Sequence, residues 1–281
     1  MYRISKVLNH NTIIGISADT NHEYLIIGKG IGFGGKISER IELPSEVKIY
    51  SLQEMTERGS ARELVSSMNP FYLEVANEVL DEAENVFHTI DRNVLLPLAD
   101  HIEYAVKRIQ KQEQISNPLT NDIRVLFHME YKAAESIRSI LQDRLGVEID
   151  DHEIGYIALH IHSAIQDEKV SEAMQMARAV RESISLVEYE TGKPIDVMSL
   201  SYNRLMNHIR CMVARAIKGE QLKLNMNDYM SVKFPQAFQT AKHICDEISI
   251  VLKCPLDEVE IGYLAMHIER VTSDELDNYE E

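Results

Sequence analysis

Apolar and polar residues alternate over the first fifty positions of this 281-residue chain and then follow a helical period. Short β-branched runs separated by Asn- and Asp-containing turns are typical of antiparallel hairpins, and they occupy residues 3–8, 12–17, 23–27 and 46–50. From about residue 60 the apolar positions recur at three- and four-residue steps, first from Leu95 to Ile109 and again from Ile154 to Ile165. The pattern therefore predicts a small antiparallel all-β N-terminal domain followed by all-α helical bundles.

The helical part contains two copies of one module. One constant shift along the chain carries His101 onto His208 and His160 onto His267 without a gap. The same shift matches a further set of residues: Arg108 with Arg215, Phe127 with Phe234, Asp150 with Asp257, and 153–156 with 260–263. A duplicated core would retain mainly apolar residues, so duplicated histidines indicate imidazole chemistry used twice. We predict a β domain at 1–56 and two homologous helical-bundle domains at 63–169 and 170–281.

Each copy has a helix-start pattern before its second histidine. Asp150 followed by Glu153 has the spacing of a capping box, and Asp257 followed by Glu260 repeats it. Gly155 lies in the first turn of the first predicted helix, where glycine costs roughly 1 kcal/mol relative to alanine. Because the second copy retains this glycine, we expect close helix packing at both positions.

The composition predicts a soluble cytoplasmic protein. Apolar residues make up 44% of the chain and charged residues 26%, as in globular domains. No apolar run approaches a membrane span, and the first residues lack the core of a signal peptide, so we expect no membrane insertion. The three cysteines have no C-x-x-C spacing, which favours free thiols in a reducing compartment.

The net charge of −16 is unevenly distributed. Residues 1–50 hold six basic and five acidic side chains, a net charge of +1, so the rest of the chain carries −17. An acidic body repels a phosphate backbone, and any contact with nucleic acid is therefore expected in the N-terminal segment. A solvated acidic helical surface remains an alternative explanation of the charge.

Several kinds of chemistry find little support in the residue spacing. His160 and His162 point about 200° apart on a helix, so they do not chelate one ion together. The chain has no G-x-S-x-G nucleophile motif and no duplicated cysteine. The glycine-rich segment 28–36 follows a strand but leads into loop, which disfavours a dinucleotide fold. With Phe33 and two lysines, this segment suits unpaired RNA bases.

The duplicated histidines lie at the edge of apolar helix faces. On a helical wheel, His160 falls at the margin of the stripe that begins at Ile154, and His101 lies one position off its own stripe. An edge position suits a side chain that a second protein must reach, whereas a packed border histidine is the ordinary interpretation of a single case. A helical metallohydrolase that uses all four histidines as ligands is the alternative from another class.

Three motifs together resemble a known family. The stretch Lys6–Asn11 followed by Ile27–Phe33 resembles the RNA-binding domain of the BglG/SacY transcriptional antiterminators. Residues 100–101 and 155–161 resemble the first phosphotransferase regulation domain (PRD) of that family, and residues 207–208 and 262–268 resemble the second. The resemblance covers the whole chain in order, and the glycine-rich loop looks most like the glucose-operon branch.

The resemblance implies an RNA-binding switch without enzyme activity, cofactor or metal. A homodimer of the β domain would bind a hairpin in the leader RNA of a sugar-transport operon and prevent termination. The RNA contacts that carry over are Lys6, Asn11, Gly28, Lys29 and Phe33. The phosphorylated residues that carry over are His101, His160, His208 and His267.

The same resemblance implies the partners of the switch. It assigns inhibition through the first PRD to a sugar-specific phosphotransferase permease and modulation through the second to the phosphocarrier HPr. This chain departs from the family at His10, where relatives often have asparagine. Asn207 stands where the first module has Asp100, so we expect weaker phosphoryl acceptance at His208 if an acidic neighbour orients the imidazole. A DNA-binding PRD activator would need a helix-turn-helix reader, which the β-rich N-terminus does not supply.

Overall fold

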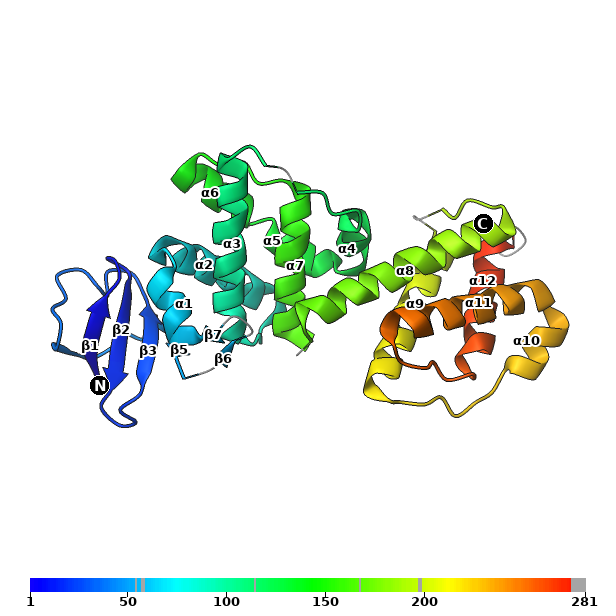
Figure 1. Ribbon diagram of the computed structural model, residues 1–281, viewed down its shortest axis with the longest axis horizontal. Coiled ribbons are helices and arrows are strands. Elements are labelled where there is room, and N and C mark those ends of the chain that lie inside the picture. Colours follow the sequence, from blue (N-terminus) through cyan, green and yellow to red (C-terminus); the bar gives the residue numbers. More distant parts are fainter. Residues whose placement is uncertain (54, 57–58, 114, 167, 197–198, 274–281) are drawn as a thin grey trace. The chain divides into compact units, whose positions relative to one another are not determined.

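The computed structural model of the chain describes residues 1–53, 55–56, 59–113, 115–166, 168–196 and 199–273 (Figure 1). Two compact units make up the chain, Met1–Val170 and Ser171–Glu281. The predicted fold class is confirmed. The first unit begins with an antiparallel sheet and continues with helices, and the described part of the second unit is helical. Among the described helices, none combines the length and the apolar character needed to cross a membrane.

The first unit begins with a five-stranded antiparallel sheet in the order β4-β1-β2-β3-β5. Its strands are β1 (Tyr2–Val7), β2 (Thr12–Ser17), β3 (Glu23–Ile27), β4 (Arg40–Ile41) and β5 (Lys48–Ser51). Ile4, Ile13 and Ile26 form a buried cluster in the sheet, and Ile13 pairs with Ile26 across β2 and β3. The four predicted strands correspond to β1, β2, β3 and β5, whereas the two-residue β4 is too short to leave a periodic signal.

Helices complete the first unit. A short antiparallel pair, β6 (Met55–Thr56) and β7 (Gly59–Ser60), leads into them. They are α1 (Ala61–Ser67), α2 (Pro70–Phe87), the 3₁₀ turn η1 (Arg92–Val94), α3 (Leu95–Gln110), α4 (Thr120–Leu126), α5 (His128–Ala134), α6 (Ile137–Leu145) and α7 (Asp151–Gln166). The apolar stripe predicted from Leu95 lies on α3, where Leu95, Leu98 and Ile102 are fully buried. Helix α3 packs against both α2 and α7.

The second unit repeats the helical part of the first. Its helices are α8 (Val170–Thr191), α9 (Leu200–Lys218), α10 (Asn227–Lys233), α11 (Pro235–Leu252) and α12 (Glu260–Thr272). The shift that relates the histidines also carries both bounds of α4 onto those of α10. It carries the start of α5 and the end of α6 onto the two ends of α11, so the repeat read from the histidines is a repeat of whole elements. One difference is that α11 is continuous where the first copy is interrupted between α5 and α6.

The predicted N-cap is confirmed in the first copy, although the Glu153 carboxylate accepts from Arg108 and does not complete a capping box. In the second copy the prediction is wrong. Asp150 Oδ1 accepts a hydrogen bond from the Glu153 backbone N–H at 2.9 Å, at the start of α7. In the second copy, Asp257 Oδ1 accepts instead from Val259 N–H at 3.1 Å, and α12 begins only at Glu260. The carboxylate there caps the turn that precedes the helix, so the helix starts later.

The two repeated glycines also differ. A Cβ on Gly262 would lie 2.7 Å from Asn227 Oδ1, so a side chain there would collide with α10. This confirms the predicted close packing in the second copy. The prediction is wrong for Gly155, because a Cβ there would meet Ile123 at 3.8 Å, an ordinary van der Waals distance.

Candidate functional site

In the first unit, two rows of polar side chains meet between α3 and α7. Helix α3 carries His101 and Arg108, which are two turns apart and so lie on one face. Helix α7 carries Glu153, Tyr156 and His160 on one face for the same reason. The His101 ring centre lies 5.5 Å from that of His160 and 5.5 Å from that of Tyr156. The two predicted histidines of this module thus form a pair.

Glu153 is the buried carboxylate of this site. Its Oε1 accepts hydrogen bonds from Arg108 Nε at 3.1 Å and Nη2 at 2.6 Å. Its Oε2 lies 3.2 Å from His101 Nε2, off the line of a hydrogen bond. Burial alone raises the pKa of Glu153, but His101 and Arg108 beside it hold that pKa below its usual value. The carboxylate is therefore ionised and shared between a guanidinium and an imidazole.

The second unit builds the same site from α9 and α12. His208 and Arg215 on α9 face Glu260 and His267 on α12, and the two imidazole centres lie 4.7 Å apart. Arg215 Nε donates to Glu260 Oε1 at 2.6 Å and Nη2 donates to Oε2 at 2.9 Å. His208 Nε2 lies 3.7 Å from Glu260 Oε2. The first imidazole of each module thus has a carboxylate beside it, whichever residue precedes the histidine.

The electrostatics of the second site favour neutral imidazoles. Burial, together with the electrostatic effect of His267 and Arg215, lowers the pKa of His208 to about 3. Burial, together with Arg270, lowers the pKa of His267 as well. A neutral imidazole keeps a lone pair on one ring nitrogen, which makes it a nucleophile at neutral pH.

Unmet polar atoms gather at both sites. Among the described residues, buried atoms without a hydrogen bond include His101 Nε2, Glu153 Oε2, His208 Nε2 and His267 Nδ1. Such atoms are uncommon in folded proteins and often mark a functional site. Part of each site is still open to solvent, since the side chains of His101 and His208 are 18% and 11% exposed.

Neither the pairing of the histidines nor their ionic partners had been predicted from the sequence. The signal was present in the spacing, since His101 and Arg108 on one helix, and Glu153 and His160 on the other, are each two turns apart. Both spacings recur in the second copy. What the sequence lacked was which two helices pack together, and so which faces meet.

The metallohydrolase alternative gains no support from this geometry. The four histidines fall into two separate pairs, one in each unit. Within the part of the chain that the structure describes, three or more His, Cys, Asp or Glu side chains are nowhere arranged to hold a metal ion.

The five residues predicted to contact RNA lie at one end of the sheet. That end holds the β1–β2 turn after Lys6, the turn residue Asn11, and the glycine-rich segment that follows β3. Lys6, Lys29 and Phe33 are exposed there, and the Phe33 side chain is 75% exposed despite its apolar ring. The structure therefore brings basic, amide and aromatic groups together on one loop cluster.

The glycines shape this cluster by close packing. A Cβ on Gly32 would lie 2.1 Å from the Asn9 carbonyl oxygen, and the Gly32 N–H donates to the His10 carbonyl at 2.9 Å. A Cβ on Gly28 would lie 2.5 Å from Val47 Cγ1. The Gly32 contacts seat the glycine-rich segment against the β1–β2 turn, and the Gly28 contact seats it against the residue before β5. They also place the Phe33 ring edge-on to His10, with the ring centres 5.6 Å apart.

Comparison with known proteins gives concordant matches. Residues 2–59 match the family model of the CAT RNA binding domain, and residues 74–164 and 181–271 each match that of the PRD domain. "Protein GlcT" of Staphylococcus haemolyticus (strain JCSC1435) is 32% identical over 271 residues and covers 95% of both chains. The "GlcA/glcB genes antiterminator" of Staphylococcus carnosus (strain TM300) is 31% identical over 277 residues and covers 96% of both. The crystal structure of GlcT CAT-PRDI matches 59% of this chain and 98% of its own, with a TM-score of 0.51 and 29% identity.

Proposed function

Since this chain belongs to the BglG/SacY family of transcriptional antiterminators, in the glucose-operon branch, we propose that it binds a leader-RNA hairpin of a sugar-transport operon as a homodimer. Binding would stabilise the hairpin and prevent termination. The chain is an RNA-binding regulator, and we propose neither a catalytic reaction nor a cofactor for it. We place its domains at 1–56, 63–169 and 170–281 and its action in the cytoplasm.

The RNA-binding part of the proposal is supported by the loop cluster at the end of the sheet. Phe33 offers an exposed ring for base stacking, and Lys6 and Lys29 offer exposed ammonium groups for phosphates. Asn11 and Gly28 belong to the turns that position these groups. The cluster also lies in the segment of positive net charge, which is where a phosphate backbone meets the least repulsion.

The observation that carries the regulatory part is the paired-histidine site found twice. We propose that the phosphotransferase system transfers phosphoryl groups to His101, His160, His208 and His267, with HPr and a sugar-specific permease as donors. The lone pair of the acceptor imidazole would form the new N–P bond. At the same time the bond between phosphorus and the donor residue would break, which is an N–P bond when the donor is a phosphohistidine, and the donor residue would keep the electron pair. The acceptor nitrogen of a neutral imidazole carries no proton, so none has to leave before attack.

The ionic partners suggest what phosphorylation would do. A phosphoryl group adds nearly two negative charges and several acceptor oxygens. On His101 it would face the ionised Glu153, 3.2 Å from the ring. Arg108, which now donates to Glu153, is the cation placed to pair with the new charge. Exchange of Arg108 between the two anions would shift the packing of α3 on α7, and with it the PRD dimer packing.

A gel shift tests the function. The full-length protein and the leader RNA of its neighbouring sugar operon are combined at several salt concentrations. We expect a protein dimer on one hairpin and an affinity that falls as salt rises, because phosphate contacts release counterions. Protein that binds neither this RNA nor its antiterminator hairpin at low salt would overturn the proposal.

A further inference from the structure

Two asparagine side chains in the β1–β2 turn are held in fixed orientations. Asn9 Oδ1 accepts from the Asn11 backbone N–H at 2.9 Å, and Asn11 Oδ1 accepts from the Gly30 backbone N–H at 2.8 Å. Each amide therefore uses its oxygen inside the loop cluster, and the –NH₂ group of each is left to point away from it. The turn thus presents two preoriented donors.

Both donors meet one carboxylate on the first helical-bundle domain. Asn9 Nδ2 donates to Glu74 Oε1 at 2.5 Å, and Asn11 Nδ2 donates to Glu74 Oε2 at 3.0 Å. Two amides that clasp the two oxygens of one anion would equally fit two oxygens of a phosphodiester, because both ligands are anionic acceptors. Glu74 therefore occupies donors that are suited to a phosphate of RNA.

Helix α2 carries several acidic side chains. Its acidic side chains are Glu74, Glu78, Asp81, Glu82 and Glu84, and it has no lysine or arginine. Glu78, Asp81 and Glu84 are each ion-paired with a lysine or an arginine, so the charge that a phosphate would meet at the Asn9–Asn11 turn is that of Glu74. The Glu74 carboxylate and an RNA phosphate thus compete for the same two amide donors, and their negative charges repel each other.

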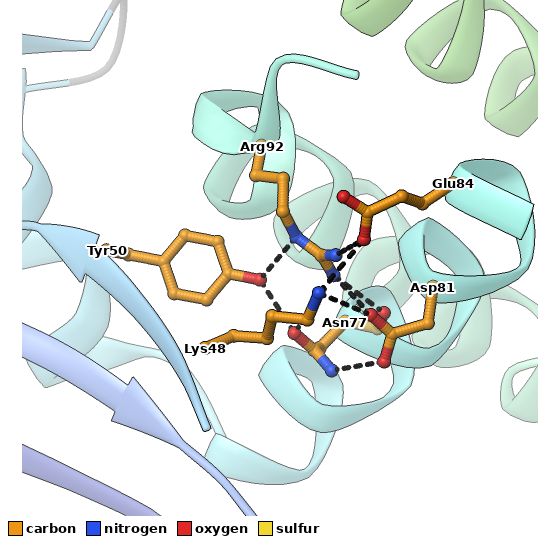
Figure 2. Close-up of polar contacts among 6 residues, drawn as sticks. All are labelled: Lys48, Tyr50, Asn77, Asp81, Glu84 and Arg92. Atoms are coloured by element: carbon orange, nitrogen blue, oxygen red, sulfur yellow. Dashed lines mark hydrogen bonds and ion pairs between the residues drawn. The ribbon is translucent and has the colours of Figure 1, made fainter. Parts of the chain in front are cut away.

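A second set of contacts holds the sheet against α2 (Figure 2). The Tyr50 hydroxyl on β5 donates to Asn77 Oδ1 at 2.6 Å and accepts from Arg92 Nε at 3.2 Å. Lys48 Nζ donates to Glu84 Oε2 at 2.9 Å, and the same oxygen accepts from Arg92. Burial raises the pKa of Tyr50 to about 12, so its hydroxyl keeps the proton that it donates.

These groups share one face of the helix. Glu74, Asn77, Asp81 and Glu84 are spaced by three, four and three residues, so they line a single stripe of α2. One end of the stripe holds the Asn9–Asn11 turn and the other end holds β5. The sheet is therefore fixed on α2 at two places at once.

We propose that the acidic stripe of α2 is an intramolecular cover for the RNA-binding turn, in which Glu74 stands where an RNA phosphate binds. This inference rests on the proposed function, because it takes Asn11 as an RNA contact. RNA binding then requires the sheet to leave α2. Whatever loosens the Tyr50 and Lys48 contacts raises RNA affinity, and this gives the first PRD a direct route to the RNA-binding domain.

Full-length variants test the cover against the leader RNA of the neighbouring sugar operon, by gel shift at constant salt. Glu74→Gln removes the charge that holds both amides and keeps the shape. Glu82→Gln removes the same charge from an exposed position of the same helix and controls for general repulsion. We expect Glu74→Gln to tighten RNA binding on the order of tenfold, the size of one charge-assisted hydrogen bond, and Glu82→Gln to leave it nearly unchanged. Tyr50→Phe, which loosens the other end of the stripe, is expected to tighten binding as well.

The outcomes separate this inference from the function beneath it. If the wild type binds RNA and the three variants Glu74→Gln, Tyr50→Phe and Glu82→Gln bind it with the same affinity, the proposed cover is wrong and the proposed antitermination stands. Equal tightening in Glu74→Gln and Glu82→Gln would also overturn it, since bulk charge would then be the cause. Failure of all four proteins to bind RNA would overturn the proposed function and the cover with it.

Discussion

At the scale of single residues, the surroundings of the His208 imidazole are expected to make the stability of the protein depend on pH. Its pKa is lowered to about 3, mainly by burial, so the folded chain binds no proton there at pH values where the unfolded chain does. The neutral form is thus the one that packs between Glu260 and His267. A stability measurement can detect this directly, without RNA or a phosphoryl donor.

We predict that the free energy of unfolding falls as pH falls through the window from about 6.5 to about 3. Because the folded pKa is the lower one, the stabilisation is complete above the unfolded pKa and is lost towards the folded pKa. Between pH 7 and pH 5 the wild type is expected to lose about 2 kcal/mol more than His208→Gln. Urea unfolding followed by circular dichroism measures the difference.

His243→Gln is the matched control for this experiment. His243 is exposed, and its hydrogen bond with Glu190 raises its pKa, so its contribution has the opposite sign. The free energy of unfolding of His243→Gln is therefore still expected to decrease between pH 7 and pH 5. Identical pH slopes for the wild type and His208→Gln would contradict the buried neutral imidazole.

Glu153 is the second single residue that is expected to affect stability. Its carboxylate is 1% exposed and forms an ion pair with Arg108. We predict that Glu153→Gln lowers the free energy of unfolding by about 2–4 kcal/mol, since it leaves a largely buried guanidinium without its charge partner. Urea unfolding of the full-length variant measures the loss.

Glu103→Gln provides the comparison on α3. It removes a carboxylate that pairs at 2.8 Å with Lys107, whose side chain is 58% exposed. A much smaller loss of stability is expected there, because solvent screens pairs spaced by four residues on a helix surface. Equal losses in the two variants would contradict a larger stabilising role for the buried Glu153–Arg108 pair.

At the scale of elements, the glycine-rich turn after β3 presents Phe33 to solvent while its backbone packs on the β1–β2 turn. We predict that Phe33→Ala weakens RNA binding by about 1–3 kcal/mol through lost base stacking. The free energy of unfolding should hardly change, because the ring is exposed. A filter-binding titration with the leader RNA measures the affinity.

Ile37 supplies the control, since it is 70% exposed just beyond the same turn and has no ring to stack. Ile37→Ala is expected to bind RNA like the wild type. If both alanine variants bound as tightly as the wild type, the exposed ring would have no part in RNA recognition.

The elements also show how far sequence patterns reach. The strands with β-branched runs and the helices with long apolar stripes were predictable, because burial of one face imposes a period. The start of α12 was not, because either Val259 or Glu260 offers an N–H to Asp257 and only the packed chain selects one. The His101–His160 pair required knowing that α3 packs on α7, which is a tertiary fact. The two-turn spacing shows which residues share a face of each helix, but it does not show which two helices pack together.

At the scale of the whole molecule, one histidine site is built twice, on helices that recur at a fixed offset, in a chain that also carries the loop cluster of the sheet. We predict that His101→Asp lowers readthrough of a terminator reporter, because it places a negative charge where a phosphoryl group would be. His101→Ala is expected to leave readthrough on without the inducing sugar, since the residue accepts no charge. Reporter activity with and without the sugar measures both.

His128→Asp is the control for this pair, because it adds the same charge at an exposed histidine of the same unit. Readthrough in that variant is expected to follow the sugar as in the wild type. Sugar-dependent regulation that persists in the double variant His101→Ala, His160→Ala would remove the first PRD as the sensor.

Phosphoryl acceptance by the duplicated histidines underlies the whole regulatory proposal. It is measured as the transfer of labelled phosphate from phosphoenolpyruvate through enzyme I, HPr and the cognate permease to the full-length chain. We predict a label that is lost in acid and stable in hydroxide, and that is absent when His101, His160, His208 and His267 are all changed to alanine. A quadruple variant that folds and takes up as much label as the wild type would contradict the proposal.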